Sequence, residues 1–361
     1  MVRAMSGTRE RALLLCLVVV TALIGVIACG DDEDGAGETE QGDEHGGGGA
    51  TGGGSAASDT ASAQARAQLE GTRVHLDLLA LAHLADVDHH GLFMDFGTPA
   101  RMHFTMGRWH NGFLRDVTAG ERDFTRIGPD ARAWFHIAAR GPLTLRFRGR
   151  PQGSRSVVVY LNGQRAGQVD FQGDGMQEVD VAVEASLTRA GENALMLRSA
   201  ETRAIQGEEV TAEIDSIWVM PGSPPEGELT PPRYAQLVRE LTVSGESRNA
   251  GVLRGPSTIR WYAEIPEHGR LALGFGGGTG ERSIRVTVVP EGGEASELHS
   301  GAVTDAWQDR VFDLAPFVGE IVRIEVAVEG GGEIGISGPA VIVPMPERAL
   351  ASAEARSVIL L

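Results

Sequence analysis

The densest group of potential metal ligands in this sequence is a short stretch rich in aspartate and histidine. Its members are His75, Asp77, His83, Asp86, Asp88, His89 and His90. Imidazole and carboxylate groups bind zinc and other divalent ions in proteins. However, no two of these histidines have the spacing that places both imidazoles on one face of a helix. A helix that ends before Gly91 explains the same histidines, because positive charge is favoured at a helix C terminus. We therefore expect no metal ion and no other cofactor.

A row of arginines gives a basic stripe in an otherwise acidic chain. The stripe consists of Arg146, Arg148, Arg150 and Arg155. Guanidinium groups match carboxylate and sulfate groups, so the stripe could bind an anionic glycan. The solvated face of a strand near the edge of a sheet produces the same alternation, and we favour this second interpretation.

The five tryptophans could stack on sugar rings, as aromatic side chains do on flat ligands. They are Trp109, Trp134, Trp218, Trp261 and Trp307. Trp134, Trp218 and Trp261 fall in strand-like patterns, which predicts positions in the core. Trp109 lies in the loop-like sequence Gly-Arg-Trp-His-Asn-Gly and is the better candidate for an exposed ring.

Motifs that would signal catalysis are missing from the sequence. It contains no Gly-x-Ser-x-Gly elbow, no phosphate-binding loop and no dinucleotide-binding fingerprint between a strand and a helix. The glycine run at residues 274–280 follows a strand pattern, but no helix pattern follows it, so we interpret it as a loop. We expect no catalytic residues in this chain.

The N terminus has the order of a secretory signal. Arg3, Arg9 and Arg11 precede an apolar run at residues 12–28, which is at the lower limit for crossing a bilayer. A small residue followed at once by Cys29 resembles the lipobox of bacterial lipoproteins. That resemblance implies a signal peptide at residues 1–28, a lipid on Cys29 and a place outside the cytoplasm. An uncleaved anchor helix with an incidental cysteine is the alternative.

Residues 29–68 are acidic and rich in glycine, and no apolar residue larger than alanine occurs from Gly30 until Leu69. Such a segment cannot bury enough surface to offset its ordering entropy, so we predict a disordered tether. The formal net charge of the whole chain is −17. This charge argues against nucleic acid as a partner. Since Cys16 lies inside the signal, Cys29 has no partner for an intramolecular disulfide.

The remainder of the sequence is typical of an all-β protein with one short helix. Helical spacing at residues 76–84 predicts the helix. Alternating apolar residues predict strands at residues 143–148, 156–161, 164–171, 179–183, 195–197 and 214–219 and, after a proline-rich stretch, at 259–265, 271–275, 284–288 and 322–328. Asn162-Gly163 predicts a tight hairpin. Many short strands with turn signals between them favour β-sandwiches or jelly rolls.

The prolines divide this part of the chain. We predict a first sandwich at residues 69–222, a linker at 223–232 and a second sandwich at 233–347, followed by a C-terminal segment at 348–361.

Two family resemblances extend this prediction. Leu161-Asn-Gly-Gln-Arg-Ala-Gly167, the strand at 179–183 and Ala190-Gly-Glu-Asn-Ala-Leu-Met-Leu197 resemble the galactose-binding-like jelly rolls appended to glycosidases. Residues 92–102, the sandwich after them and Arg356-Ser-Val-Ile-Leu-Leu361 resemble the non-catalytic front of large bacterial sulfatase-like lipoproteins of the alkaline-phosphatase superfamily. The second resemblance implies that residues 348–361 open a hydrolase domain whose catalytic groups would lie beyond Leu361. Gly97-Thr-Pro-Ala-Arg101 is similar to the sulfatase signature, but Gly97 offers no nucleophile.

Together these features predict a lipid-anchored, extracytoplasmic, non-catalytic protein that binds a glycan or a partner protein. Two alternatives remain open. The chain could be the truncated front piece of a sulfatase-like hydrolase, or it could be a structural protein of the cell envelope. Apart from Cys29 as the lipid site, the sequence does not identify the residues that bind a ligand.

Overall fold

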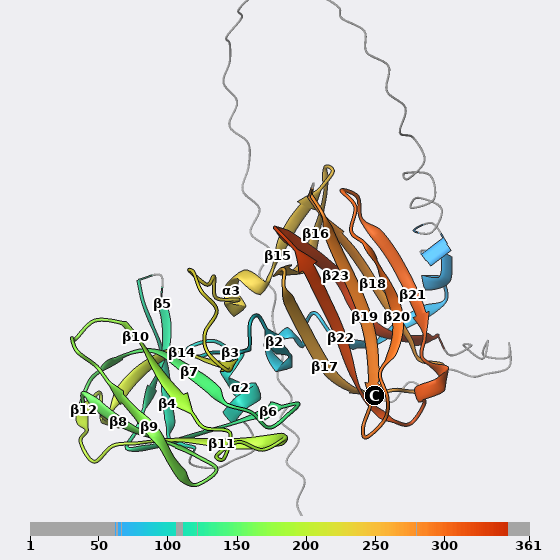
Figure 1. Cartoon of the computed structure of the whole chain (residues 1–361). Coiled ribbons are helices and arrows are strands. Elements are labelled where there is room, and N and C mark those ends of the chain that lie inside the picture. Colours follow the sequence, from blue (N-terminus) through green and yellow to red (C-terminus); the bar gives the residue numbers. More distant parts are fainter. Residues whose placement is uncertain are drawn as a thin grey trace, which may run out of the picture. The chain divides into compact units, whose positions relative to one another are not determined.

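The computed structural model describes residues 62–345, except residues 63, 66, 106–110, 121 and 279. The predicted signal, Cys29, Trp109 and the C-terminal segment at 348–361 lie outside the described residues. Within the described part, the regular structure is almost entirely β, as predicted, and the strands form two sandwiches (Figure 1). None of the helices in this part is long and apolar enough to span a membrane.

The first sandwich consists of two sheets with a hydrophobic core between them. One sheet has the order β10-β7-β14-β3, with the β4-β5 hairpin attached to β14, and the other has the order β6-β11-β8-β9. Its strands are β3 (Leu92–Asp95), β4 (Phe113–Ala119), β5 (Arg122–Ile127), β6 (Asp130–Ile137), β7 (Leu143–Pro151), β8 (Ser156–Leu161), β9 (Gln164–Asp170), β10 (Gln177–Val183), β11 (Gly191–Arg198) and β14 (Ala212–Pro221). β12 (Arg203–Ile205) and β13 (Glu208–Val210) form a separate hairpin.

The alternation of the sequence decides which side chains enter this core. The predicted inward face of β7 is buried and consists of Leu143, Leu145 and Phe147. The predicted hairpin between β8 and β9 is also confirmed, since Leu161 pairs with Gln164 across Asn162 and Gly163. These two turn residues have φ values of 52° and 82°. Positive φ at both central positions is what a type I′ turn requires.

The second sandwich has the same architecture. One layer has the order β17-β22-β19-β20 and is continuous, through β2 (Asp86–Asp88), with the β10-β7-β14-β3 layer of the first sandwich, so that both belong to one 11-stranded sheet. The other layer has the order β15-β16-β23-β18-β21 (Figure 1). Its strands are β15 (Val238–Val243), β16 (Glu246–Arg254), β17 (Ser257–Glu264), β18 (Arg270–Gly277), β19 (Arg282–Pro290), β20 (Ser296–Ala302), β21 (Gln308–Asp313), β22 (Ile321–Gly330) and β23 (Glu333–Pro344). Short helical segments are α2 (Arg101–Thr105), α3 (Tyr234–Leu237), η1 (Ala82–Leu84) and η2 (Ala315–Phe317).

The first strand of the described part belongs to the second sandwich, which corrects the predicted domain boundary. β1 (Thr72–Asp77) pairs antiparallel with β23. Leu78, Ala82 and Val87 are buried in the core of the second sandwich. The proline-rich stretch alone places these residues in the first sandwich, because they lie on the N-terminal side of it. The second sandwich is therefore discontinuous in sequence, and the first is inserted between its parts.

The helix predicted at residues 76–84 is wrong for most of its length. Leu76 lies in β1, and only Ala82–Leu84 form one turn of 3-10 helix, η1. Spacing alone could not separate the two structures, because Leu76 and Leu78 also fit the period of a strand. The pairing of β1 with β23 satisfies the backbone hydrogen bonds that a helix would otherwise have made.

Two residues in the range of the predicted tether pack against the second sandwich. Ser62 and Ala65 are 8% and 5% exposed. Ser62 Oγ accepts a hydrogen bond of 3.1 Å from the backbone N–H of Asp309. Residues 62, 64, 65, 67 and 68 are helical, so the predicted disorder is wrong for the end of this range, while the range up to residue 61 lies outside the described residues.

The glycine run at residues 274–280 is a strand over part of its length, not a loop. β18 continues to Gly277, and Gly276 and Gly277 pair with Gly335 and Ile334 of β23. A Cβ atom on Gly276 would lie 3.1 Å from the indole ring of Trp307. The glycine therefore makes room for this buried tryptophan.

The proline-rich segment between the sandwiches contains no helix or strand from Gly222 to Arg233. Its end is held by a buried ion cluster. Arg233 Nη2 lies 2.7 Å from Asp215 Oδ1, and Arg233 Nη1 lies 3.7 Å from Asp95 Oδ1. Arg148 Nε lies 3.2 Å from Asp215 Oδ2. The cluster thus joins the end of the linker to β3, β7 and β14.

Asp95 and Asp215 are 3% and 0% exposed, so this cluster has two carboxylates out of contact with water. Burial raises the pKa of Asp95 to about 6, although the N–H of Tyr234 and the charge of Arg233 oppose this shift. The Tyr234 N–H donates a hydrogen bond of 2.6 Å to Asp95 Oδ2. Asp95 therefore ionises at a higher pH than an exposed aspartate.

Candidate functional site

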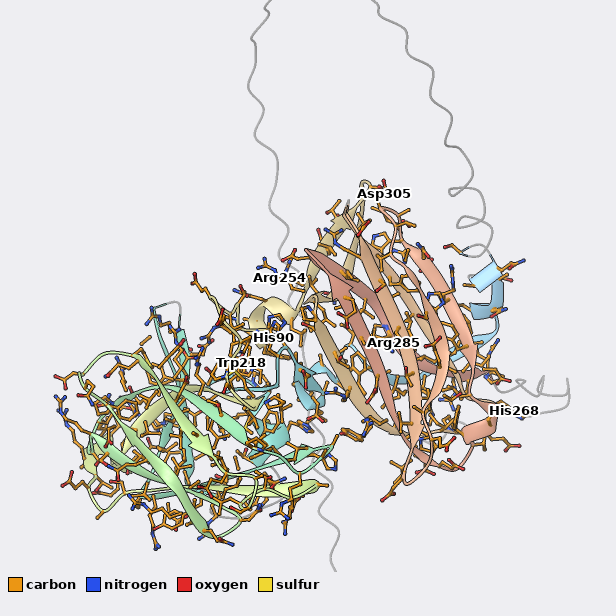
Figure 2. The ribbon with its side chains drawn as sticks, viewed as in Figure 1. His90, Trp218, Arg254, His268, Arg285 and Asp305 are labelled. Carbon is orange, nitrogen blue, oxygen red and sulfur yellow. The ribbon has the colours of Figure 1, made fainter. Side chains whose placement is uncertain are left out.

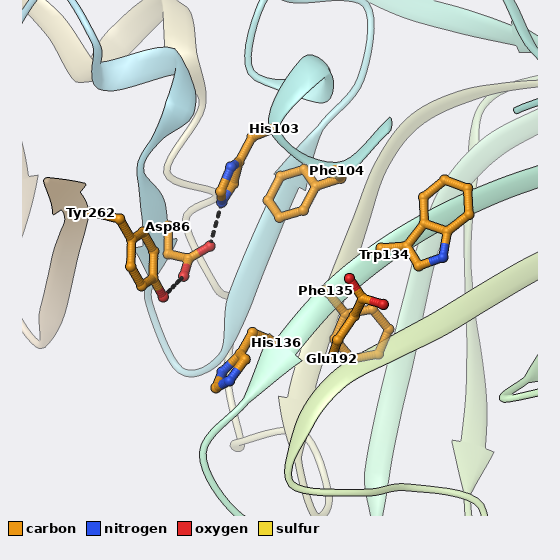
Figure 3. Close-up of a pocket in the computed structure, with 8 residues that line it drawn as sticks. All are labelled: Asp86, His103, Phe104, Trp134, Phe135, His136, Glu192 and Tyr262. Atoms are coloured by element: carbon orange, nitrogen blue, oxygen red, sulfur yellow. Dashed lines mark hydrogen bonds and ion pairs between the residues drawn. The ribbon is translucent and has the colours of Figure 1, made fainter. Parts of the chain in front are cut away.

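The candidate site is built around Asp86 at the start of β2 (Asp86–Asp88). Its side chain is largely buried, and both carboxylate oxygens accept hydrogen bonds (Figure 3). Asp86 Oδ1 lies 2.7 Å from His103 Nε2, and Asp86 Oδ2 accepts a hydrogen bond of 2.9 Å from the hydroxyl of Tyr262. The carboxylate is therefore fixed in orientation from two sides.

His103 reaches Asp86 because the chain turns sharply between β3 and α2. Gly97 has a φ of 82°, and a Cβ atom at this position would lie 2.2 Å from the backbone nitrogen of Phe124. Only glycine fits this close approach. Thr98 Oγ1 donates a hydrogen bond of 3.0 Å to the carbonyl of Asp95 and accepts one of 3.3 Å from the N–H of Ala100. Gly97-Thr-Pro-Ala-Arg101 thus leads the chain into the helix that presents His103.

The electrostatics of the site follow from these hydrogen bonds. Burial acts to raise the pKa of Asp86, but the hydrogen bond and charge of His103, with the hydrogen bond of Tyr262, outweigh it and lower the pKa below its ordinary value. Burial, followed by the charge and hydrogen bond of Asp86, raises the pKa of Tyr262. At neutral pH the site therefore holds an ionised carboxylate next to a neutral phenol that donates to it.

Residues of the first sandwich form the opposite wall of the pocket. Its volume is about 290 Å³, and its lining from this sandwich consists of His103, Phe104, Trp134, Phe135, His136 and Glu192 (Figure 3). His136 of β6 and Glu192 of β11 lie directly opposite each other in the register of the two strands, so their side chains are on the same face of the sheet. Trp134 lies two residues before His136, so its side chain is on the same face of the sheet. The wall therefore combines an aromatic ring, an imidazole and a carboxylate.

A second pocket, of about 340 Å³, adjoins the first and shares Asp86, His136 and Tyr262 with it. The Tyr262 side chain is 45% exposed although its hydroxyl is bonded to Asp86. Arg260 and Arg323 also line this second pocket, together with Glu325. The Tyr262 ring thus offers an open aromatic surface between two polar walls.

The histidines and aspartates of residues 75–90, considered above as potential metal ligands, do not converge on one point in the structure. Among the described residues, no group of three or more histidine, cysteine, aspartate or glutamate side chains could hold a metal ion. Asp86 points to His103, whereas the His89 ring bonds to the Pro256 carbonyl and the Ser257 hydroxyl, each at 2.9 Å. The prediction that a helix ends before Gly91 is wrong, because Asp86–Asp88 form the strand β2.

Among these histidines and aspartates, Asp77, His83, Asp88 and His90 have local contacts, whereas His75 is exposed on β1. Asp77 Oδ1 accepts a hydrogen bond of 3.0 Å from the N–H of Ala80, and His83 Nδ1 lies 3.2 Å from the carbonyl of Ala80. Asp88 Oδ1 accepts a hydrogen bond of 3.2 Å from the N–H of Gly91. His90 has a φ of 55° and, labelled in Figure 2, lies on the turn between β2 and β3. These contacts shape turns.

Arg146, Arg148 and Arg150 lie on one face of β7, which is next to the edge strand of its sheet, as expected, whereas Arg155 lies in the loop before β8. β7 has β10 on one side and β14 on the other. Each arginine of the stripe forms an ion pair, and the partners are Asp180 for Arg146, Glu178 and Asp215 for Arg148, Glu213 for Arg150 and Asp174 for Arg155. Acidic residues on β10 and β14 therefore pair with the three arginines of β7, and an acidic residue of the loop before β10 pairs with Arg155, which could not be read from β7 alone.

Of the tryptophans predicted to be core residues, Trp218 and Trp261 are both 4% exposed. Trp218, labelled in Figure 2, donates a hydrogen bond of 3.0 Å to the carbonyl of His89. Trp134 is a correction, because it is only partly buried and lines the candidate site. Ala131, Ala133 and Phe135 occupy the inward face of β6 instead.

Sequence reasoning missed His103, Tyr262 and Glu192. Glu192 lies in the Gly-Glu-Asn stretch that carries the jelly-roll resemblance, but that resemblance gives it no role, and His103 and Tyr262 belong to no motif. One signal was present: Arg-Trp-Tyr-Ala in β17 places Tyr262 on the face opposite the buried Trp261. An aromatic residue on the outer face of a strand is a candidate for ligand contact.

Comparisons with known proteins found no matching family model and no matching curated protein. Solved structures do match. A family 35 carbohydrate-binding module from an environmental isolate is 20% identical, with a TM-score of 0.23, and the match covers 34% of this chain and 98% of that one. The CBM22-1–CBM22-2 tandem domain of Paenibacillus barcinonensis Xyn10C is 10% identical, with a TM-score of 0.22, and the match covers 67% and 96%.

The ANX2 ectodomain from Arabidopsis thaliana is 9% identical, with a TM-score of 0.22, and the match covers 64% of this chain and 89% of that one. At these values, no ligand and no site residue can be transferred to this chain. The sulfatase-like relationship stays a prediction.

Proposed function

We propose that this protein is a non-catalytic saccharide-binding protein and that the pocket around Asp86 is its binding site. We further propose that a lipid on Cys29 holds it outside the cytoplasm, at the cell envelope. The arrangement of Tyr262 and Asp86 carries the first proposal. The Tyr262 ring is nearly half exposed, and an ionised carboxylate of fixed orientation lies 2.9 Å from its hydroxyl.

This combination suits a sugar ring. One face of a pyranose carries C–H groups, which pack on an aromatic ring, while its hydroxyls need hydrogen-bond acceptors and donors at the rim. Tyr262 and Trp134 supply rings in the pocket, and Asp86 and Glu192 supply acceptors. The fixed orientation of Asp86 lowers the entropy lost when a ligand is bound.

The first test is loss of binding after removal of the rings. We expect Tyr262→Ala and Trp134→Ala each to weaken oligosaccharide binding by about tenfold or more, because each removes a stacking surface. Tyr262→Phe keeps the ring and should therefore lose less affinity than Tyr262→Ala. Isothermal titration calorimetry with cellohexaose, mannohexaose and xylohexaose measures the effect.

A matched control is Tyr160→Ala. Tyr160 is a partly buried aromatic residue on β8, on the same face of the same sheet as Trp134, and it does not line the pocket. Binding that is equally weakened by Tyr160→Ala would show a general effect on folding. Binding that survives both pocket substitutions would place the saccharide site elsewhere, and no binding by the wild type would refute the proposed function.

The second test concerns the anchor. Cys29→Ala should abolish metabolic labelling of the protein with palmitate, because the thiol is the proposed site of acylation. Cys16→Ala, a substitution in the proposed signal segment, should leave the labelling intact. Unchanged labelling of the Cys29→Ala protein would refute the lipid anchor without affecting the proposed binding site.

A further inference from the structure

The charge of the two adjoining pockets points to the class of saccharide. Their lining includes four carboxylates, Asp86, Asp88, Glu192 and Glu325, and two guanidinium groups, Arg260 and Arg323. Among the described lining residues, these carboxylates outnumber the guanidinium groups by two. A ligand that enters this space meets excess negative charge.

The two arginines are already engaged with acidic partners. Arg260 Nε lies 3.2 Å from Glu325 Oε1, and Arg323 Nε lies 2.5 Å from the same oxygen. Arg260 Nη1 also lies 3.6 Å from Asp88 Oδ2. An acidic sugar at either guanidinium group would therefore lie next to the negative charge of Glu325, which weakens its attraction to the arginine.

Asp86 is the strongest obstacle to an anion. It is 7% exposed, and its negative charge is fixed beneath the opening by His103 and Tyr262. A charge in such a poorly hydrated place is weakly screened, so its repulsion of a second anion is stronger than at an open surface. The exposed ring of Tyr262, where we place the sugar, is the group that donates to this carboxylate.

We propose that the site selects saccharides that carry no acidic group and rejects uronic acids and sulfated sugars. This inference rests on the proposed function and adds the substrate class to it. The pocket accepts the hydroxyl groups of a neutral sugar as donors to Asp86 and Glu192, and a protonated amino sugar meets the same charge favourably. Among the described lining residues, the guanidinium groups that a carboxylate on the sugar would meet already face Glu325 and Asp88.

Matched ligands test the inference. Each neutral hexaose of the binding panel that has a C6 hydroxyl is compared with its C6-oxidised counterpart, which has the same linkage and ring stereochemistry but one carboxylate on each unit. We expect the acidic member to bind the wild-type protein at least about tenfold more weakly at low ionic strength. Raising the salt from about 0.01 M to about 0.15 M should reduce this difference, because screening weakens repulsion.

Two variants test whether the charges of the lining cause this selectivity. Asp88→Asn and Glu325→Gln each remove one negative charge, and Glu325→Gln also releases the two arginines. We expect both variants to reduce the difference in affinity between acidic and neutral ligands. The reduction should be larger for Glu325→Gln. Asp174→Asn is the control. It makes the same charge change at an exposed residue that pairs with Arg155 and lies outside both pockets, so the difference in affinity should stay as in wild type.

The outcomes separate the two proposals. Neutral binding with weak acidic binding supports both. Acidic ligands that bind as tightly as neutral ones, or more tightly, would overturn the inference while the proposed function stands. If no member of either series binds, both fail.

Discussion

Replacing Arg233 with leucine should lower the free energy of unfolding by about 3–5 kcal/mol. Arg233 forms an ion pair with Asp215, in which Nη2 and Oδ1 are 2.7 Å apart, and faces Asp95 at 3.7 Å, and both carboxylates are buried. Without the guanidinium group, their negative charges remain in the interior with only Arg148 to compensate them. Urea unfolding followed by circular dichroism measures the change.

A matched control is Arg155→Leu. Arg155 also forms an ion pair, but its side chain is 57% exposed and that of its partner Asp174 is 85% exposed. Because exposed pairs contribute little, we expect a change within about 0.5 kcal/mol. If Arg233→Leu yields no folded protein, the double variant Arg233→Leu/Asp215→Asn should recover stability, because it removes one of the two unpaired charges. Equal effects of Arg233→Leu and Arg155→Leu would contradict the role of the buried cluster.

Asp95→Asn should change how stability depends on pH. The pKa of Asp95 is raised from 3.8 to about 6 in the folded protein, mainly by burial. Between these two values the folded state holds more protons than the unfolded state, so the wild-type protein loses stability as the pH rises through about 6. A shift of about two pH units corresponds to roughly 3 kcal/mol. Asparagine does not ionise, so the variant should gain about this much relative to wild type between pH 4 and pH 7.

The measurement is the difference between the unfolding free energies of the two proteins across this pH range. Asp86→Asn serves as the contrast. The pKa of Asp86 is lowered, so its contribution to stability is present at neutral pH and is lost as the pH falls through its folded-state pKa. Between pH 4 and pH 7 the difference between Asp86→Asn and wild type should therefore stay constant and should shrink only below pH 3.8, whereas the difference between Asp95→Asn and wild type should grow as the pH rises. Parallel curves for Asp95→Asn and wild type would show that Asp95 ionises normally.

The strands could be predicted from the sequence because alternation reports which face of a strand is buried. β7, β8, β19 and β22 follow this rule closely, and their inward residues are core residues. β6 shows its limit. Ala133, Trp134 and Phe135 are all apolar, so the phase of the strand is ambiguous, and the small alanine rather than the large tryptophan is buried.

The candidate site could not be predicted, because its members are distant in the chain. Asp86 was recognised as a possible ligand residue, but its two partners are 17 and 176 residues away. Both approach only after the sandwiches have formed. The assignment of β1 failed for the same reason, since the strand that completes its hydrogen bonds is β23, at the other end of the described part.

The pairing of β1 with β23 has a consequence for biosynthesis. β1 leaves the ribosome before any other strand of the described part, whereas β23 is made last. The nascent chain therefore holds β1 without its partner while every strand of the first sandwich is already available to fold. A recombinant fragment that starts after residue 88 would lack β1 and would leave the C-terminal half of β23 as an open sheet edge, which is a template for aggregation. Expression of the second sandwich alone thus requires residues 72–88 to be fused or supplied in trans.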